Sequence, residues 1–511
     1  KAMVQKPRDH EIILVLNGTF PNTIEAIRAE FEDIMSQENI KVWQQFFDTS
    51  AIIPENKWRK KAGEILREEF INSLQGDIIF STNLQEGLVD NACTSVKLLP
   101  TKSLICSTLH DVVPLIYPDD FLSNDTVCEW YLEKIDFIKK SDIVLTDSRS
   151  SKAEISELLK VPIEKIHVIY NGINHDKFKP MSVGSNDKNE LLARMNISDH
   201  FIMYVGETGL NKNLDRLLSA FSKLPKSILN SYELVMVGRD PKHEKSNYQK
   251  QLEDLSIEDR VIFTGQVDDD DLVKLYNLCD LFVFPSIHEG FGLPPLEAMA
   301  CGAAVIASNK SSLPEVVGYD DILFNPFDDN DIAEKIIKIL TDSKFRNEIK
   351  IRGIKQACMF SWSDSAERLL NIFEKYVKNG GNDAASSNRC DHINVIINHV
   401  ALMSSGLSFD DKDLIALSIS ISETFCPRKK SKPMVYVDVS AIIKQDDRTG
   451  IQRVTRAICS ELINNPHPLV DIELVYSSPD DSEFYRANDL INKISKAGSN
   501  NFDDEMVVFC A

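Results

Sequence analysis

The sequence predicts an α/β protein with two doubly wound domains, each a parallel sheet covered by helices. Three observations support this fold class. Apolar runs of strand length alternate with amphipathic stretches from residue 11 onward, the alternation stops at a polar break near residues 171–189, and it restarts over a second region of similar size. Strands that alternate with helices indicate βαβ units, and two separate series of them indicate two domains.

The first region opens with the apolar run 12–16, which ends at Asn17-Gly18 and therefore predicts a buried strand followed by a turn. An amphipathic stretch over residues 24–35 and a helical pattern over residues 151–159 separate the strands of this region. Further buried strands are predicted at residues 77–80, 104–108, 143–146 and 167–170.

The second region repeats this pattern after the polar break. Its strands are predicted at residues 201–205, 233–237, 261–263, 281–284 and 304–307. Two such domains that face one another place a cleft between the carboxyl ends of their strands, and ligands of open α/β sheets bind at those ends.

The alternation is lost again from Asn379-Gly380-Gly381 onward. One or two helices are expected there, over residues 391–403 and 410–420, and a basic tract follows at residues 427–433. We interpret this tract as a solvated linker rather than a membrane-binding patch. A strand at residues 435–439 and a helix at residues 450–462 then predict the opening of a third α/β unit.

Composition excludes several classes of function. The chain has 57 Lys and Arg against 78 Asp and Glu, a net charge of −21, which argues against wrapping nucleic acid. Its ten cysteines are scattered without a Cys-x-x-Cys pair, as expected for reduced thiols in a cytosolic protein rather than for a zinc site or a disulfide framework. No signal peptide and no apolar run of about 18 residues is found. Both ends look cut, so we expect a slice of a longer protein.

The segment 285–302 carries the most information about chemistry. It follows a predicted strand, so its loop lies at a carboxyl end, and Gly290 and Gly292 allow the backbone to approach a ligand closely. A helix begins at Pro294 or Pro295, and its free N–H groups favour an anion. Glu289 and Glu297 are eight residues apart and could both accept hydrogen bonds from the hydroxyls of one ligand. A structural turn with a solvated glutamate is the alternative.

As a whole string, this segment closely resembles the E-x7-E signature of glycosyltransferase family 4, the retaining GT-B enzymes. The segments 304–308 and 313–317 resemble that family too. The resemblance covers residues 11 to about 378 and implies a GT-B fold of two Rossmann-like domains facing across a cleft. It also implies a division of the chain into four parts. Residues 1–180 form an acceptor-side domain that is completed by a helix at 363–378, and residues 181–362 form a donor-binding domain. Residues 379–432 are a linker, and residues 433–511 are the truncated start of a second glycosyltransferase module. In this interpretation the first domain lacks its opening strand and glycine-rich loop, and residues 1–10 are the tail of a helix.

The resemblance also implies a set of donor-binding residues. The strand and loop at 204–214 are similar to the family's diphosphate-binding segment, in which a lysine precedes a helix. The family usually has Arg-Lys there, whereas this sequence has Asn211-Lys212, so fewer charges are available to neutralise phosphate. Val237-Gly238-Arg239 is similar to the loop that passes the nucleotide base. The donor-binding residues implied are Gly206, Lys212, Arg239, Glu289, Gly290, Phe291, Gly292, Leu293 and Glu297.

A histidine of the first domain completes the implied catalytic set. Residues 108–114 resemble the family's His-Asp loop, in which His110 would contact the transferred sugar and Asp111 would hold the loop. The implied catalytic residues are Glu289, His110 and Lys212. Residues 16–21, 86–90 and 110–118 more narrowly resemble the polymerising mannosyltransferases of bacterial O-antigen assembly, and residues 436–440 and 448–453 resemble the start of a second module.

The function implied is retaining transfer of a hexose, with mannose from GDP-mannose as the expected donor, to a growing surface polysaccharide such as O-antigen. Glu289 would orient sugar hydroxyls, Glu297 the ribose and His110 the sugar. No metal and no cofactor is expected. The expected partners are the nucleotide-sugar donor, a glycan or lipid-linked glycan acceptor, and a membrane or assembly complex. The expected location is cytoplasmic, with peripheral attachment at the inner face of the cell membrane.

Other functions remain open at this point. A catalytically degenerate GT-B scaffold or regulatory module is favoured by Asn211 and opposed by Glu289, Glu297, Lys212 and His110. A glycosyltransferase that uses a UDP-sugar, a GT-B phosphorylase and a nucleotide-sugar epimerase share the same two-domain cleft. No lysine stands out that would suit a cofactor-dependent phosphorylase.

Overall fold

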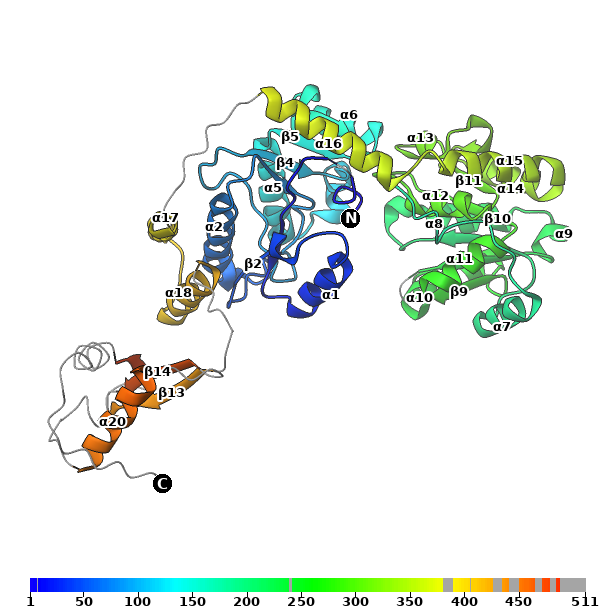
Figure 1. Ribbon diagram of the computed structural model, residues 1–511. Coiled ribbons are helices and arrows are strands. Elements are labelled where there is room, and N and C mark those ends of the chain that lie inside the picture. Colours follow the sequence, from blue (N-terminus) through cyan, green and yellow to red (C-terminus); the bar gives the residue numbers. More distant parts are fainter. Residues whose placement is uncertain are drawn as a thin grey trace. The chain divides into compact units, whose positions relative to one another are not determined.

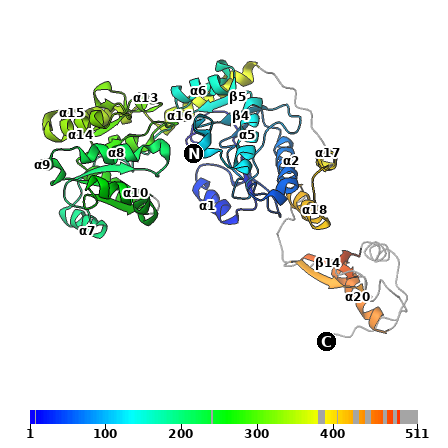
Figure 2. The same ribbon diagram turned by 180° about the vertical axis from the view of Figure 1, so that it is seen from behind.

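The computed structural model describes residues 1–6, 8–238, 241–379, 389–404, 406–425, 434–440, 450–464, 471–477 and 484–487. The chain divides into two compact units, Lys1–Cys426 and Pro427–Ala511 (Figures 1 and 2). The first unit contains both of the predicted α/β domains. None of the helices in the described parts of the chain is both long and apolar enough to cross a bilayer.

The first domain has six parallel strands in two separate sheets. β1 pairs with β2, and β3, β4, β5 and β6 form a second sheet in that order. The strands are β1 (Leu14–Asn17), β2 (Ile40–Trp43), β3 (Ile78–Ser81), β4 (Leu104–Thr108), β5 (Ile143–Thr146) and β6 (Ile166–Val168). The helices and single turns are α1 (Pro21–Phe31), η1 (Gln37–Asn39), η2 (Pro54–Asn56), α2 (Lys57–Ser73), α3 (Val113–Ile116), α4 (Pro118–Phe121), α5 (Asp125–Lys140), α6 (Arg149–Leu159) and η3 (Ile163–Lys165). The strands predicted from the sequence are confirmed, and β2 is an addition.

The second domain has a single six-stranded parallel sheet with the order β12-β11-β10-β7-β8-β9. Its strands are β7 (Phe201–Val205), β8 (Glu233–Val237), β9 (Val261–Gly265), β10 (Leu281–Phe284), β11 (Val305–Ser308) and β12 (Leu323–Phe324). Its helices and turns are α7 (Ser185–Met195), η4 (Leu210–Lys212), α8 (Leu214–Ser222), α9 (Lys226–Leu229), α10 (Pro241–Leu255), α11 (Asp269–Leu278), α12 (Leu293–Ala300), α13 (Leu313–Val317), η5 (Asp320–Ile322), α14 (Asp329–Thr341) and α15 (Ser343–Ala357). The central strands are apolar and buried on both faces, as a parallel sheet covered by helices requires.

A long helix, α16 (Trp362–Asn379), returns from the second domain to the first (Figure 1). Its Leu369 and Phe373 join Cys106, Ile143 and Leu145 of the first domain in one apolar cluster. The predicted helix at residues 363–378 that completes the first domain is therefore observed.

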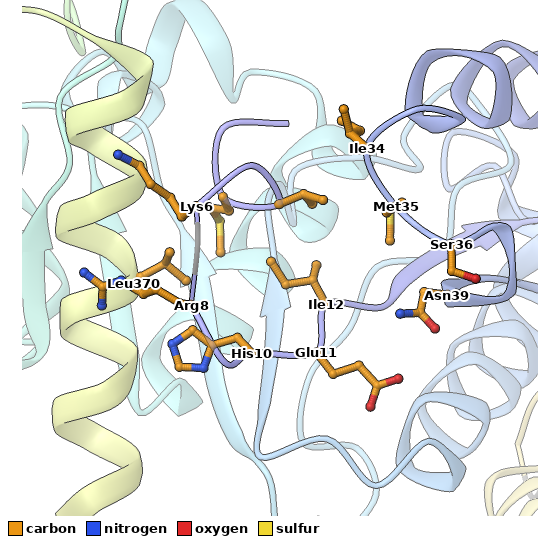
Figure 3. Close-up of a pocket in the computed structure, with 12 residues that line it drawn as sticks. Lys6, Arg8, His10, Glu11, Ile12, Ile34, Met35, Ser36, Asn39 and Leu370 are labelled. Carbon is orange, nitrogen blue, oxygen red and sulfur yellow. The ribbon is translucent and has the colours of Figure 1, made fainter.

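The interpretation of residues 1–10 as the tail of a helix is wrong, since the described residues 1–6 and 8–10 contain none. Arg8 pairs with both Glu367 and Glu374 of α16, and His10 lies 3.0 Å from Glu374. These contacts hold the segment along α16 (Figure 3). A cavity of about 210 Å³ lies beside it, lined mainly by residues that precede β1 and β2. It is therefore at the amino ends of these strands, away from the edge where ligands of such sheets bind.

The structure also corrects the predicted linker at residues 379–432. Residues 389–425 form α17 (Arg389–Met403) and α18 (Asp411–Phe425), and both helices pack on α2 as part of the first unit. Ile396 and Leu417 share a core with Trp58 of α2. The Thr424 hydroxyl accepts the backbone N–H of Gln44 at 2.9 Å, directly after β2. These helices cover one side of the first domain, and residues 380–388, 405 and 426–432 of the predicted linker lie outside the described part.

The second unit has β13 (Met434–Asp438) parallel to β14 (Asp471–Ser477), with β15 (Phe484–Arg486) antiparallel to β14. One helix, α20 (Gly450–Asn464), is described, and Cys459 from it packs with Val439 and Leu474. The predicted strand and helix at residues 435–439 and 450–462 are confirmed.

Candidate active site

The order of the second sheet places two functional loops side by side. From β7 the chain moves outward through β8 and β9 and then returns to β10, on the other side of β7. The strand order therefore reverses between β7 and β10, and ligands of open α/β sheets bind at such a switch point. The loop after β7 carries Gly206 and Lys212, and the loop after β10 carries Glu289.

Lys212 and Glu289 meet at this point. The Lys212 ammonium lies 2.6 Å from Glu289 Oε1, and the two side chains are 21% and 14% exposed. Lys212 ends the single turn η4, just before α8. The structure thus joins two residues that are 77 positions apart in the sequence, and it leaves both partly open to solvent.

Asn211, which stands where the family usually has arginine, fastens the loop that bears Glu289. Its side-chain Nδ2 donates to the carbonyl oxygen of His288 at 3.0 Å, and its own carbonyl accepts the N–H of Ile287 at 2.8 Å. Both contacts tie η4 to the β10 loop. Asn211 therefore has a positioning task that its place in the sequence did not indicate.

Two serines hold the backbone of the Glu289–Phe291 segment from the opposite side. Ser311 Oγ accepts the N–H of Glu289 at 2.9 Å, and Ser312 Oγ lies 2.9 Å and 2.6 Å from the carbonyl oxygens of Glu289 and Phe291. Among the described residues, none accepts a hydrogen bond from the N–H groups of Gly290, Phe291 or Gly292. Together with the first turn of α12, these N–H groups suit an anion.

Gly290 and Gly292 both lie where a side chain would not fit. A Cβ atom at Gly290 would lie 3.0 Å from the carbonyl oxygen of His110, across the gap between the domains. Gly292 has φ +112° and precedes α12, and a Cβ there would lie 2.8 Å from the Leu313 side chain. Close backbone approach therefore explains both glycines.

The other predicted donor-binding residues differ in how far they are available to a ligand. The Phe291 side chain is buried against Tyr170 and Phe360, with ring centroids 6.2 Å and 5.6 Å away, so only its backbone is available to a ligand. Leu293 begins α12 and is 39% exposed. The N–H of Gly206 donates to the carbonyl of Val237. Arg239 lies outside the described residues.

Glu297 does not pair with the residues around Glu289. Its Oε2 accepts the Tyr276 hydroxyl of α11 at 3.0 Å, and burial raises the pKa of Glu297 to about 7. A carboxyl group with this pKa can carry a proton at neutral pH and then donate as well as accept. The structure therefore separates the two glutamates of the signature into two environments.

In the first domain, His110 forms a pair that the sequence analysis did not include. His110 follows β4 and Asp147 follows β5, the neighbouring strand, and His110 Nδ1 lies 2.6 Å from Asp147 Oδ2. Asp147 is buried, whereas the His110 side chain is 46% exposed. The hydrogen bond to Asp147 raises the pKa of His110. The available signal was the position of Asp147 directly after a predicted strand.

Helix α6 joins the two domains. The Glu315 carboxylate accepts the N–H groups of Arg149 and Ser150, each at 3.1 Å, and the Tyr170 hydroxyl at 2.9 Å. Ser151 Oγ donates to the carbonyl of Gly290 at 3.2 Å. Farther along α6, Glu154 Oε2 lies 3.1 Å from His288 Nε2. The helical pattern of residues 151–159 predicts α6, but no motif in the sequence indicates these contacts.

Among the described residues, the site combines one lysine and N–H groups that have no acceptor, which suit a diphosphate, with carboxylates and a histidine, which suit sugar hydroxyls. Among the residues that the structure describes, no three His, Cys, Asp or Glu side chains gather as a metal site would require.

Comparisons with known proteins identify the family of this chain. Residues 188–356 match the family model of glycosyl transferases group 1, and residues 77–177 match that of glycosyltransferase family 4. The serotype-specific mannosyltransferase WbdA of Escherichia coli is 30% identical over 491 residues, which cover 95% of this chain and 57% of WbdA. The chain thus spans little more than half the length of that relative. The O-antigen chain mannosyltransferase RfbU of Salmonella typhimurium is 32% identical, over 50% of this chain and 68% of its own length.

Solved structures show the same fold. Sucrose-phosphate synthase from Thermosynechococcus elongatus superposes with a TM-score of 0.54 at 19% identity, over 72% of this chain and all of its own. Anabaena HepE, solved with UDP and glucose, gives a TM-score of 0.53 at 20% identity over the same shares. These are GT-B enzymes, so the predicted fold class is confirmed. With matching motifs, matching domain models and relatives of this similarity, the chain belongs to glycosyltransferase family 4, the group 1 glycosyltransferases.

Proposed function

We propose that this chain is a retaining hexosyltransferase that moves mannose from GDP-mannose to a growing bacterial surface polysaccharide such as O-antigen. The observation that carries the proposal is the Lys212–Glu289 pair beside the unpaired N–H groups at the start of α12. The named mannosyltransferase relatives support the choice of sugar and acceptor.

In the proposed reaction the donor diphosphate takes the place of Glu289 as the partner of Lys212. The lysine and the N–H groups of Gly290, Phe291 and Gly292 then stabilise the charge of the departing diphosphate. Glu289, released from the lysine, accepts hydrogen bonds from the sugar hydroxyls. His110, held by Asp147 through Nδ1, offers Nε2 to the sugar from the first domain.

The bond between the sugar C1 and the diphosphate oxygen breaks while C1 bonds to the acceptor hydroxyl on the same face of the ring. The acceptor proton passes to the departing diphosphate oxygen, so the configuration at C1 is retained. We propose that this step uses no metal and no cofactor, because Lys212, the loop N–H groups and the α12 dipole supply the positive field. Glu297 is proposed to contact the ribose.

We propose that the acceptor is a glycan or a lipid-linked glycan. A lipid-linked acceptor would place the enzyme in the cytoplasm at the inner face of the cell membrane, as a peripheral protein or a member of an assembly complex.

A catalytically degenerate GT-B scaffold is the second candidate, and Asn211 favours it. Asn211 is engaged with the β10 loop and carries no charge, so neutralisation of a diphosphate rests on Lys212.

Calorimetric titration of the full chain with GDP, UDP and ADP tests the proposal. We expect GDP to bind selectively, and Lys212→Ala to weaken it by about 10- to 100-fold, because a charge-assisted hydrogen bond contributes roughly 1.5–3 kcal/mol. Lys223→Ala is the matched control, since Lys223 lies on the same domain and bonds to Asn330. Selective binding of UDP would change the donor to a UDP-sugar. Failure of the folded chain to bind any nucleotide would favour the scaffold.

A further inference from the structure

In residues 288–291, here called the donor loop, each carbonyl oxygen accepts a hydrogen bond from a side chain. Asn211 holds that of His288, and Ser312 holds those of Glu289 and Phe291. These two residues belong to the same domain as the loop. The carbonyl of Gly290 differs, because its hydrogen bond comes from Ser151 on α6 of the first domain.

This contact controls the direction of the next N–H group. In a trans peptide the carbonyl and the following N–H point in opposite directions, and none of the described peptide bonds is cis. A hydrogen bond from Ser151 to the Gly290 carbonyl therefore turns the Phe291 N–H away from α6. Glycine at 290 leaves this peptide free to rotate when nothing holds its carbonyl.

Ser151 is well placed for this task. Its side chain is buried, and its hydroxyl lies 3.0 Å from that of Ser148, the residue before α6. Glu315 of the second domain fixes the first turn of the same helix through the N–H groups of Arg149 and Ser150. One carboxylate of the second domain therefore binds the start of α6, and Ser151 is the next residue along the helix.

We propose that Ser151 is a positioning residue that completes the diphosphate site of the donor loop only when the two domains are in contact. The inference rests on the proposed function. When the domains are in contact, the first turn of α6 binds the Glu315 carboxylate, and the Ser151 hydroxyl donates to the Gly290 carbonyl. The Phe291 N–H is then available to bind the diphosphate of a nucleotide sugar.

A functional consequence follows from this coupling. With the domains apart, the Gly290–Phe291 peptide is not held, and the departing diphosphate loses one hydrogen-bond donor. Cleavage of the donor is then favoured in the closed enzyme, where water is excluded. Ser151 would thus favour transfer to the acceptor over hydrolysis of the donor.

The test compares Ser151→Ala with Ser156→Ala in the full chain. Ser156 is on the same helix, but its hydroxyl donates to Val161 within the first domain. We expect Ser151→Ala to weaken GDP binding and to lower kcat by about tenfold, the usual size for one hydrogen bond, and to raise the ratio of donor hydrolysis to transfer. The KM for the acceptor should stay unchanged, and Ser156→Ala should match the wild type.

A second pair of variants tests the route through Glu315. Glu315→Ala should reproduce the effect of Ser151→Ala on hydrolysis, and the double variant should be no worse than either single one, because the two residues act as a unit.

The outcomes separate the two proposals. A folded Ser151→Ala enzyme that binds GDP and partitions the donor like the wild type would overturn the inference while leaving the proposed function intact. Fully additive effects of Ser151→Ala and Glu315→Ala would also overturn it. A wild-type chain that binds no nucleotide would remove both.

Discussion

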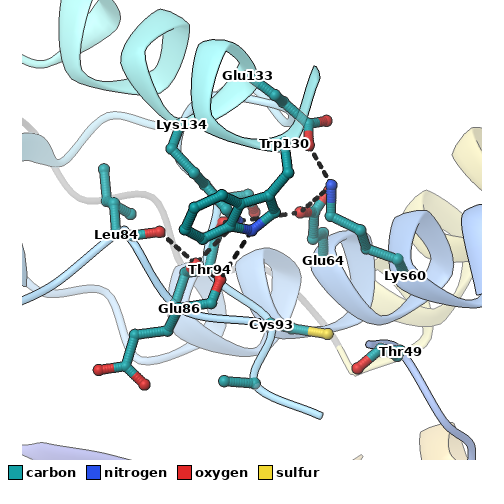
Figure 4. A network of polar contacts seen from close by, with 12 residues as sticks. Thr49, Lys60, Glu64, Leu84, Glu86, Cys93, Thr94, Trp130, Glu133 and Lys134 are labelled. Atoms are coloured by element: carbon teal, nitrogen blue, oxygen red, sulfur yellow. Dashed lines mark hydrogen bonds and ion pairs between the residues drawn. The ribbon is translucent and has the colours of Figure 1, made fainter. Parts of the chain in front are cut away.

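Two regions of the first unit use Lys–Glu pairs for different purposes. In the interior of the first domain, Lys134 of α5 lies 3.7 Å from Glu64 of α2, and the side chains are 1% and 0% exposed (Figure 4). In the candidate site, Lys212 and Glu289 are closer, at 2.6 Å, yet remain 21% and 14% exposed. Access to solvent therefore distinguishes the two regions better than distance does.

The interior pair belongs to a network without room for a ligand. Lys134 Nζ donates to the carbonyl and the hydroxyl of Thr94, and Lys60 Nζ lies 3.7 Å from Glu64. The network ties α2 and α5 to the segment that contains Thr94. Burial of Lys134 lowers its pKa, yet nothing can reach the group. A perturbed charge indicates a functional site only where a ligand can replace its partner.

The largest effect should come from breaking the interior pair. Lys134→Met removes the fully buried one of three lysines near the Glu64 carboxylate, and Lys60 at 3.7 Å and Lys61 at 3.4 Å remain. We expect a loss of about 3 kcal/mol in the free energy of unfolding, at the lower end of what a broken buried pair costs. Urea denaturation measures this loss. Nucleotide affinity of the folded protein should be unchanged, which would separate this network from the site.

Two further variants check that interpretation. Lys139→Met, on the same helix but with an exposed side chain, should change stability by less than about 0.5 kcal/mol. Lys134→Met combined with Glu64→Gln should recover much of the loss, because no unpaired charge then remains buried. If Lys134→Met is as stable as the wild type, the network is not structural.

An intermediate effect on the free energy of unfolding is expected at Glu297, because burial raises the pKa of this carboxyl group from 4.5 to about 7. The folded state then holds this proton more tightly than the unfolded state does. Its contribution to stability is complete below pH 4.5 and is lost as the pH rises through 7, by at most ~3 kcal/mol. Glu297→Gln lacks this dependence, so its stability relative to the wild type should increase over that interval.

Unfolding free energies of both proteins at pH 4.5, 6 and 7.5 measure the difference. Glu258→Gln, an exposed residue of the same domain, is the control and should show no pH-dependent difference from the wild type. A constant difference between Glu297→Gln and the wild type at all three values would contradict a raised pKa.

The smallest effect is expected on the transfer rate, when the His110–Asp147 pair is broken. The hydrogen bond to Asp147 raises the pKa of His110 above 6.5, so this pair stabilises the fold fully below pH 6.5 and less as the pH rises through the raised value. Asp147→Asn should lower the pKa of His110, move the alkaline limb of the transfer rate to lower pH and reduce that rate about tenfold.

NMR titration of the His110 ring protons and a pH–rate profile measure these changes. Asp280→Asn removes a similar contact, in which His200 Nδ1 lies 3.1 Å from Asp280. His200 and Asp280 directly precede β7 and β10, at the ends of these strands opposite the candidate site. That variant should transfer sugar like the wild type. An unchanged His110 titration in Asp147→Asn would show that Asp147 does not control this histidine.

Much of the fold could be predicted because it depends on local patterns. The strands Phe201–Val205, Glu233–Val237 and Leu281–Phe284 coincide with their predicted bounds, since each is a short apolar run between polar turns. The prediction was wrong for residues 389–425. Their helices were expected, but their packing on α2 depends on contacts such as that between Thr424 and Gln44, 380 positions apart.

The candidate site, like the fold, could be predicted from the sequence only in part. Lys212, Glu289 and His110 stand out by motif and by their positions after strands, and their catalytic roles stay predictions. Asp147 has only its position after a strand as a signal. The sequence did not indicate the contacts of Glu315 and Ser151, because a carboxylate or a hydroxyl acquires a role only from the group that it meets.

The sequence by itself determined the α/β alternation, the two-domain division and the family, because apolar periodicity and glycine-rich loops are properties of neighbouring residues. Only the tertiary structure decided which distant groups meet. It paired Lys212 with Glu289, placed Glu297 beside Tyr276, and brought Ser151 to the carbonyl of Gly290 across two domains. The physical reason is that hydrogen bonds and ion pairs act over about 3–4 Å, so they depend on how whole elements pack.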